Sequence, residues 1–225
     1  MTRIAVLASG SGSNLQAILD ACAEGRIEGE VVVVASNAPE ARALERARSA
    51  GVAAELVPSK GVTDRVTYDE RLLEVLRRHE VDIVCLAGYM RLVTPTFLDA
   101  FAPSPARGGC PGVLNIHPAL LPSFPGLHAQ RQALAYGSRF SGCTVHFVDA
   151  GTDTGPIIVQ AVVPVLPGDT EESLSARILA EEHRIYPEAI QWLAEGRLTL
   201  AGRRVTVLDA AAPSLDDVSN PCRDR

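Results

Sequence analysis

Runs of apolar residues alternate along most of the chain with segments whose apolar residues recur at helical spacing. A continuous apolar run is typical of a strand buried on both faces, because a half-exposed strand alternates apolar and polar positions. Strands are therefore predicted at residues 3–9, 30–37, 53–57, 82–88, 113–117, 144–148 and 157–165. The last strand is expected to be longer than the one before it and is a candidate for antiparallel pairing.

Helical segments and turn residues fill the intervals between these strands. Helices are predicted over residues 13–23, 39–50, 66–79, 95–101, 127–136 and 171–195. The last helix is expected to be interrupted or kinked at Pro187, since proline lacks an N–H donor and crowds the preceding turn. Residues 102–112, with three prolines and three glycines, are expected to form a loop, and residues 198–208 a terminal hairpin.

Strands that alternate with helices predict a doubly wound α/β fold, in which a mostly parallel sheet is covered by helices on both faces. A length of 225 residues suits one domain, and the chain contains no repeat and no linker-like segment. The expected domain spans residues 1–209, followed by a disordered tail over residues 210–225.

Charge and composition narrow the possible functions. The net charge of −6 argues against sequence-independent binding of nucleic acid, which depends on clustered Lys and Arg. Lys60 is the single lysine among 21 basic residues, which removes the lysine that a Walker A loop requires. No apolar run is long enough to span a membrane, and the N-terminal run is too short for a signal peptide. The five cysteines are scattered without a C-x-x-C pair, so we expect a cytoplasmic location and neither a disulfide framework nor a zinc site.

The strongest candidate for chemistry is the end of the predicted strand at residues 113–117, with the sequence Asn115-Ile116-His117-Pro118. Side chains alternate across a strand, so Asn115 and His117 point to the same face. Open α/β sheets bind ligands outside the carboxyl ends of their strands, where this pair is expected to lie. A lone histidine is more often structural, but an in-phase asparagine at a strand end favours function. An amide and an imidazole, joined by a carboxylate, could stabilise an oxyanion and transfer protons.

A second candidate is the turn Ser9-Gly10-Ser11-Gly12-Ser13-Asn14 between the first strand and the first helix. Backbone N–H groups at a helix N-terminus favour an anion such as phosphate. The alternative is a tight turn with serine capping, and the turn alone leaves both open. A dinucleotide is disfavoured, because Leu15 replaces the third glycine of the fingerprint and no acidic residue ends the second strand at Ser36-Asn37.

For several other residues, a structural role is the default interpretation. Asp149 and Asp153 lie in a glycine-rich loop, where aspartate usually bonds to its own backbone. Met90 and Leu92 are expected in the core, and Glu182 on a solvated helix face. A structural role is also expected for four histidines, His79, His128, His146 and His183.

Five motifs occur in an order that resembles one known family. They are Ser9-Gly10-x-Gly12-Ser13-Asn14, Ala87-Gly88-Tyr89-Met90-Arg91, Asn115-Ile116-His117-Pro118-x-Leu120-Leu121-Pro122, Pro125-Gly126-Leu127-His128 and Asp153-x-Gly155-Pro156-Ile157. Together they closely resemble the phosphoribosylglycinamide formyltransferases, the folate-dependent glycinamide ribonucleotide transformylases of purine synthesis. The likeness extends from Arg3 to about Leu200.

The resemblance implies a formyltransferase fold with a Rossmann-like N-terminal half. Residues 1–101 would bind the ribonucleotide phosphate, and residues 113–200 would hold the catalytic groups and the folate. The implied reaction transfers the formyl group of 10-formyltetrahydrofolate, a co-substrate, to the amine of N1-(5-phospho-D-ribosyl)glycinamide in de novo purine (IMP) biosynthesis, without a metal. The rival function is a formyltetrahydrofolate hydrolase, which would use the same catalytic set with water as acceptor.

The resemblance also implies roles for individual residues. Asn115, His117 and Asp153 would be catalytic: a protonated His117 and the Asn115 amide would stabilise the oxyanion, while Asp153 would raise the pKa of His117 and help to relay a proton. The ribonucleotide would be bound by Gly12, Ser13, Asn14 and Glu182. The folate would be bound by Arg65, Met90, Arg91, Leu92, Val93, Asn115, Val148, Asp149 and Asp153.

Two features depart from the family pattern. Ala119 stands where the family usually has serine, so any hydroxyl contact there is lost. The loop at residues 103–112 is longer than in compact members and is expected to shape the folate entrance or a subunit contact. The expected partners are the two small-molecule substrates, and neither nucleic acid nor a membrane is expected to bind. The protein is expected to be a monomer or a homodimer.

Overall fold

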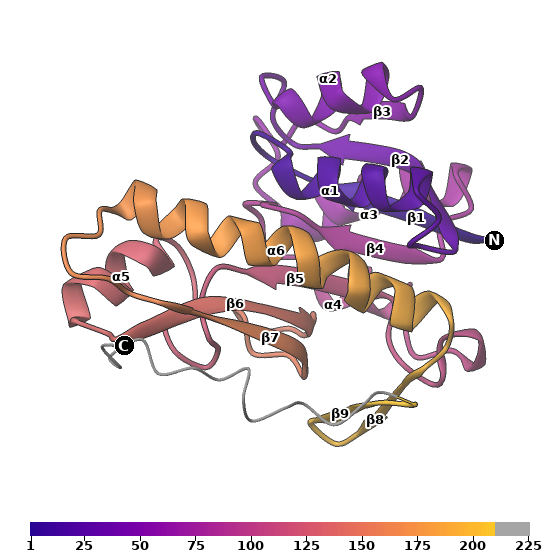
Figure 1. The fold of residues 1–225 in the computed structure, drawn as a ribbon. Coiled ribbons are helices and arrows are strands. Elements are labelled where there is room, and N and C mark those ends of the chain that lie inside the picture. The colour runs from indigo at the N-terminus through magenta and orange to yellow at the C-terminus, as the bar shows by residue number, and fades with distance from the viewer. Residues whose placement is uncertain (210–225) are drawn as a thin grey trace.

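Seven strands form one sheet in the spatial order β3-β2-β1-β4-β5-β6-β7 (Figure 1). They are β1 Thr2–Leu7, β2 Gly29–Ser36, β3 Ala53–Leu56, β4 Ile83–Leu86, β5 Val113–His117, β6 Phe140–Phe147 and β7 Ile157–Pro164. Strands β1 to β5 are parallel, whereas β6 pairs antiparallel with β5 and β7 antiparallel with β6. The predicted α/β fold with a mostly parallel sheet is confirmed. The structure, a computed structural model, describes residues 1–209, so the predicted tail lies outside the described residues.

Helices cover both faces of the sheet (Figure 1). They are α1 Ser13–Ala23, α2 Arg42–Ser49, α3 Arg65–Arg78, α4 Pro95–Asp99, α5 Ala129–Tyr136 and α6 Glu171–Ala194, with a 3-10 helix η1 Pro105–Arg107. Along β1, Ile4 and Val6 pack in the core that α1 and α6 cover, whereas Ala5 and Leu7 pack in the core that α3 and α4 cover. This division explains the unbroken apolar run of β1, because every side chain is buried whichever face it points to.

The predicted start of β6 is wrong. The strand begins at Phe140, four residues before the expected start at residue 144, and both β6 and β7 contain eight residues. The sequence pattern does not reveal these first residues of β6, because Ser141 and Gly142 are typical turn residues. Both are nevertheless buried, and they pair with Val163 and Val162 of β7. The expectation that the second strand is longer is therefore wrong, and its antiparallel pairing is confirmed.

Several helices differ from their predictions, and α4 ends at Asp99, two residues before the predicted end at residue 101. Helix α6 continues from Glu171 to Ala194 with Pro187 inside it, so the predicted interruption is wrong. Pro187 is buried along with much of α6, and the packing of this long helix outweighs the loss of one N–H donor. Helices α2 and α5 begin three and two residues later than expected, and His128 before α5 has a φ of 59°, which a helix does not continue through.

The last two strands, β8 Leu198–Ala201 and β9 Arg204–Val207, form the predicted hairpin. The proline- and glycine-rich loop at residues 103–112 lies against it, because the Cys110 thiol donates to Leu198 O over 3.4 Å, while Arg107 Nη1 donates to Asp82 O over 3.2 Å. This loop therefore lies at the amino ends of β4 and β5, and none of its residues lines the cavity described below. Within residues 1–209, no helix combines the length and the hydrophobicity needed to cross a bilayer.

Candidate active site

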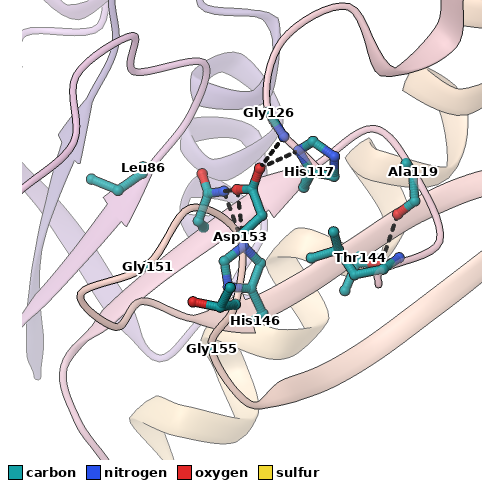
Figure 2. Close-up of polar contacts among 12 residues, drawn as sticks. Leu86, His117, Ala119, Gly126, Thr144, His146, Gly151, Asp153 and Gly155 are labelled. Atoms are coloured by element: carbon teal, nitrogen blue, oxygen red, sulfur yellow. Dashed lines mark hydrogen bonds and ion pairs between the residues drawn. The ribbon is translucent and has the colours of Figure 1, made fainter. Parts of the chain in front are cut away.

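Asn115 and His117 of β5 converge on one carboxylate, that of Asp153. Figure 2 shows this carboxylate between His117, His146 and the Gly126 N–H. Asp153 belongs to the loop between β6 and β7, called here the Asp153 loop (residues 148–156). Asn115 Nδ2 donates to Asp153 Oδ1 over 3.4 Å, and His117 Nδ1 lies 3.3 Å from Asp153 Oδ2. The backbone N–H of Gly126 also donates to Asp153 Oδ2, over 2.7 Å. The three residues expected to be catalytic are thus adjacent, and a second loop contacts the same carboxylate.

Both ring nitrogens of His117 face acceptors. Nε2 lies 2.8 Å from the carbonyl oxygen of Phe124, and Nδ1 faces the carboxylate of Asp153. Burial lowers the pKa of His117 below its ordinary value, while the Phe124 carbonyl and the Asp153 charge act to raise it. The expected upward influence of Asp153 is present, but burial outweighs it. The two contacts orient the ring so that an imidazolium, which carries a proton on each nitrogen, would donate to both acceptors.

The Asp153 carboxylate remains ionised at neutral pH. Burial acts to raise its pKa, but the hydrogen bond from the Gly126 N–H and the charge of His117 act to lower it, and the pKa lies below its ordinary value. Asp153 adopts a φ of 53°. This conformation is uncommon for residues other than glycine, although Asp tolerates it better than most. The default interpretation of Asp153 as a residue that only bonds to its own loop is wrong.

His146 is a member of the site that sequence reasoning assigned to structure alone. It lies opposite Asn115 in the β5–β6 register, and its Nε2 is 3.1 Å from Asn115 Nδ2 and 3.7 Å from Asp153 Oδ1. Its Nδ1 is 2.8 Å from Phe147 O, which can only accept, so we assign the ring proton to Nδ1. Nε2 then accepts from Asn115 and fixes which end of the amide faces Asp153. The strand register would have revealed His146, but register is not visible in an isolated strand.

The glycine turn (residues 9–14) connects β1 to α1. Gly12 has a φ of 71°, and a Cβ there would lie 2.9 Å from Cα and Cβ of Ala43 in α2, so the turn requires glycine at this position. Asn14 Nδ2 donates to Glu182 Oε2 of α6 over 2.8 Å, and both side chains are buried. Two residues expected to bind the ribonucleotide, 168 positions apart, are therefore in contact.

Glu182 does not lie on a solvated helix face, because only 6% of its surface is exposed. Burial raises the pKa of Glu182, and the Asn14 amide acts in the opposite direction. Asn14 Oδ1 is buried and has no hydrogen-bond partner among the described residues. A buried acceptor without a partner is costly unless a ligand satisfies it, which makes this pair a candidate binding site for a donor group.

An open cavity of about 430 Å³ adjoins Asn115, His146 and Asp153. Five further residues expected to bind folate line it: Arg91, Leu92, Val93, Val148 and Asp149. The remaining lining residues are Leu86, Tyr89 and Gly151. The guanidinium of Arg91 lies 4.0 Å from the centre of the Tyr68 ring, a cation–π contact that fixes its position.

Arg65 and Met90 are not among the residues that line this cavity. Arg65 begins α3 and is exposed, while the backbone N–H of Met90 donates to Ser9 Oγ over 2.8 Å. Met90 and Leu92 are 62% and 51% exposed, so the expectation that they belong to the core is wrong. Asp149 keeps the loop role expected of it, since its Oδ1 accepts from the N–H of Gly151 over 3.1 Å. Within the described chain, no three His, Cys, Asp or Glu side chains form a group that could hold a metal ion.

Comparison with known proteins identifies relatives of this chain. The model of the formyl transferase family matches residues 2–190. The chain is 46% identical over 197 residues to the phosphoribosylglycinamide formyltransferase of Escherichia coli (strain K12), covering 88% of this chain and 89% of that protein. It superposes on the crystal structure of glycinamide ribonucleotide transformylase 1 from Symbiobacterium toebii with a TM-score of 0.88 and 60% identity, covering 93% of this chain and 95% of that chain.

A solved deformylase is also similar in fold. The formyltetrahydrofolate deformylase from Pseudomonas syringae pv. tomato str. DC3000 gives a TM-score of 0.83 at 25% identity. The match covers 92% of this chain but 66% of that one. In identity, and in the share of the relative's own length that is covered, the chain is more similar to the two transferases.

Proposed function

The chain belongs to the formyl transferase family, and from this premise we propose that it transfers the formyl group of 10-formyltetrahydrofolate to the amine of N1-(5-phospho-D-ribosyl)glycinamide in purine (IMP) biosynthesis. The observation that carries the proposal is the convergence of Asn115, His117 and Asp153 beside an open cavity. The chain is an enzyme whose relatives of 46% and 60% identity are transferases. A hydrolase with the same catalytic set is the weaker alternative, because the deformylase is only 25% identical.

The proposed mechanism begins when the amine of the ribonucleotide attacks the formyl carbon and forms a tetrahedral adduct. The oxygen of that adduct gains negative charge and needs donors aimed at it. The Asn115 N–H and a ring N–H of His117 would supply them. The Asn115 N–H bonds now to His146 and Asp153, and His117 Nε2 to Phe124 O, so the formyl oxygen must replace one of these contacts.

Proton transfer is the second part of the mechanism. The attacking amine must lose a proton, and the folate nitrogen must gain one as its bond to the formyl carbon breaks. Asp153 is ionised and lies beside His117, so it can accept the proton, directly or through water, and pass it toward the leaving nitrogen. Its negative charge also favours the imidazolium form of His117 in the adduct.

The two substrates would bind on opposite sides of this centre. We assign the ribonucleotide to Gly12, Ser13, Asn14 and Glu182: its phosphate at the N-terminus of α1, and its ribose or glycinamide donors at Glu182 and the free Oδ1 of Asn14. We assign the folate to the cavity, with Arg65 and Met90 meeting only the part of it that extends outside. Such an enzyme needs no metal and no nucleic-acid or membrane partner, and we expect it in the cytoplasm as a monomer or a homodimer.

A spectrophotometric assay of deformylated folate, run with and without the ribonucleotide, tests the proposal. We expect product only when both substrates are present. Equal rates with and without the ribonucleotide would favour hydrolysis. A His117→Ala protein with near-normal turnover would instead reject the oxyanion role of His117.

A further inference from the structure

The Asp153 loop is held partly by contacts among its own residues. Asp149 Oδ1 accepts from Gly151 N and from the Thr154 hydroxyl, and Gly155 passes so close to β6 that a Cβ there would lie 1.7 Å from Phe147 O. Between these points Asp153 occupies a left-handed conformation. Such a conformation persists only where the surroundings hold it. The position of the carboxylate therefore depends on how firmly the backbone around it is held.

Arg203 of the β8–β9 hairpin holds this backbone from outside the loop. Its Nη2 donates to Thr154 O over 2.6 Å and to Gly155 O over 3.5 Å. These two carbonyls belong to the residues that directly follow Asp153. A guanidinium forms charge-assisted hydrogen bonds, which are stronger than those between neutral groups. The contact joins residues almost fifty positions apart, so it is a tertiary contact and not part of the loop's own turn.

The hairpin is itself anchored, so Arg203 extends from a fixed base. Leu198 at its start is fully buried and accepts from the Cys110 thiol. At the same open end of the hairpin, Arg197 donates from Nε and Nη2 to Leu208 O over 3.2 and 3.0 Å. Gly202, with a φ of 61°, precedes Arg203 in the turn. The hairpin lies beneath the β6–β7 pair in Figure 1 and beyond residue 190, where the family match ends.

We propose that Arg203 is a positioning residue for the formyl transfer. By holding the carbonyls of Thr154 and Gly155, it keeps the Asp153 carboxylate beside Asn115 and His117. This inference rests on the proposed function, since the position of Asp153 matters for the reaction only if Asp153 takes part in it. Arg203 touches no reacting atom and acts only through the loop.

Three variants of the full-length protein test this role. Arg203→Ala removes both hydrogen bonds, and Arg203→Lys retains a charged donor that can reach one carbonyl. Arg204→Ala is the matched control, because it removes the same charge from the adjacent position and the described residues make no hydrogen bond or ion pair with that side chain. Each protein is measured for amide hydrogen exchange in residues 149–156 and for steady-state kinetics with both substrates.

We expect Arg203→Ala to speed exchange in the Asp153 loop several-fold and to lower kcat/KM for the formyl folate by about tenfold. The KM for the ribonucleotide should be unchanged, because its proposed site lies on α1 and α6. Arg203→Lys should recover part of both effects, and Arg204→Ala should match the wild-type protein. A loss of folding alone would not produce this division between the two substrates.

Wild-type exchange in the loop of Arg203→Ala overturns the inference, whatever the transfer rate. Faster exchange with unaltered folate kinetics also overturns it, because the loop would then be released without consequence. A wild-type protein that transfers no formyl group overturns the proposed function and the positioning role together. Failure of the proposed function is distinguishable from failure of the positioning role, because it is seen in the wild-type protein with Arg203 unaltered.

Discussion

The glycine turn and the Asp153 loop both present groups at the proposed site, but they are held in different ways. The turn follows β1 directly, begins α1, and needs Gly12 because Ala43 lies against it. The Asp153 loop depends on contacts from distant parts of the chain, including the Gly126 N–H and Arg203. The turn is thus shaped by its place between β1 and α1 and by close packing against Ala43, whereas the loop of the proposed catalytic carboxylate is held by hydrogen bonds from distant parts of the chain.

The largest expected effect separates the two regions by function. Asp153→Asn keeps the shape of the side chain but removes the charge that raises the pKa of His117 and accepts the proton. We expect kcat to fall on the order of 1000-fold. The KM for the ribonucleotide should stay within about twofold, since the glycine turn is untouched. Steady-state kinetics measure both, and a kcat within tenfold of wild type would remove Asp153 from the chemistry.

Glu182→Gln tests the binding side of the comparison. We expect the KM for the ribonucleotide to rise on the order of 10- to 100-fold, because hydrogen bonds to a charged group contribute about 1.5–3 kcal/mol. The KM for the folate should remain close to the wild-type value. A comparable rise in both KM values would show that the effect of Glu182 is not confined to the ribonucleotide.

The same variant has a pH-dependent effect on stability. Burial raises the pKa of Glu182 in the folded protein above its unfolded value, so its stabilising contribution is present below the unfolded pKa and lost as the pH rises through the folded pKa. Glu182→Gln should therefore unfold at a higher urea concentration than the wild-type protein at pH 8, and the difference should shrink near pH 4. Equal urea midpoints at pH 8 would argue against a buried, destabilising carboxylate.

A smaller effect is expected at His146, which orients Asn115 in the catalytic region. His146→Leu removes the acceptor at Nε2, so the Asn115 amide loses the contact that fixes its direction. We expect kcat to fall about tenfold, by analogy with other residues that orient a reacting group through one hydrogen bond. His146→Gln, whose carbonyl can accept the same bond, should recover part of the rate. If both variants lose activity equally, packing and not orientation explains the loss.

The last prediction concerns stability alone and the local fit of the glycine turn. Gly12→Ala places a Cβ against Ala43 in a left-handed conformation, and we expect the free energy of unfolding to fall by about 1–3 kcal/mol. Gly10→Ala is the matched control, because a Cβ at Gly10 meets nothing within 4 Å. Its free energy of unfolding should change by less than about 0.5 kcal/mol. Urea denaturation of both proteins checks this difference, and equal losses would contradict the role of Ala43.

The sequence predicts what is encoded locally and misses what depends on register. Every strand of the sheet overlaps a predicted strand, and the unbroken apolar pattern is explained by burial on both faces in central strands such as β4. Alternation within β5 places Asn115 and His117 on one face, and both contact Asp153. His146 was missed, because its place opposite Asn115 follows from the β5–β6 pairing and from no feature of its own strand.

Tertiary packing explains the other differences. Pro187 stays inside a continuous α6 whose packing buries it, and Glu182 is buried because α6 packs against α1. Neither contact is visible in helical spacing alone, where proline predicts a break and a glutamate predicts an exposed face. The link between Arg203 and the Asp153 loop is of the same kind.

The most direct test of the central claim follows the formyl carbon itself. The wild-type protein is incubated with 10-formyltetrahydrofolate carrying a ¹³C-labelled formyl group and with the ribonucleotide, and the products are measured by mass spectrometry. Our account predicts one labelled formyl group on the ribonucleotide for each folate deformylated, and label transfer slowed on the order of 1000-fold in the Asp153→Asn protein. Label recovered as free formate, at a rate that the ribonucleotide does not change, would contradict it.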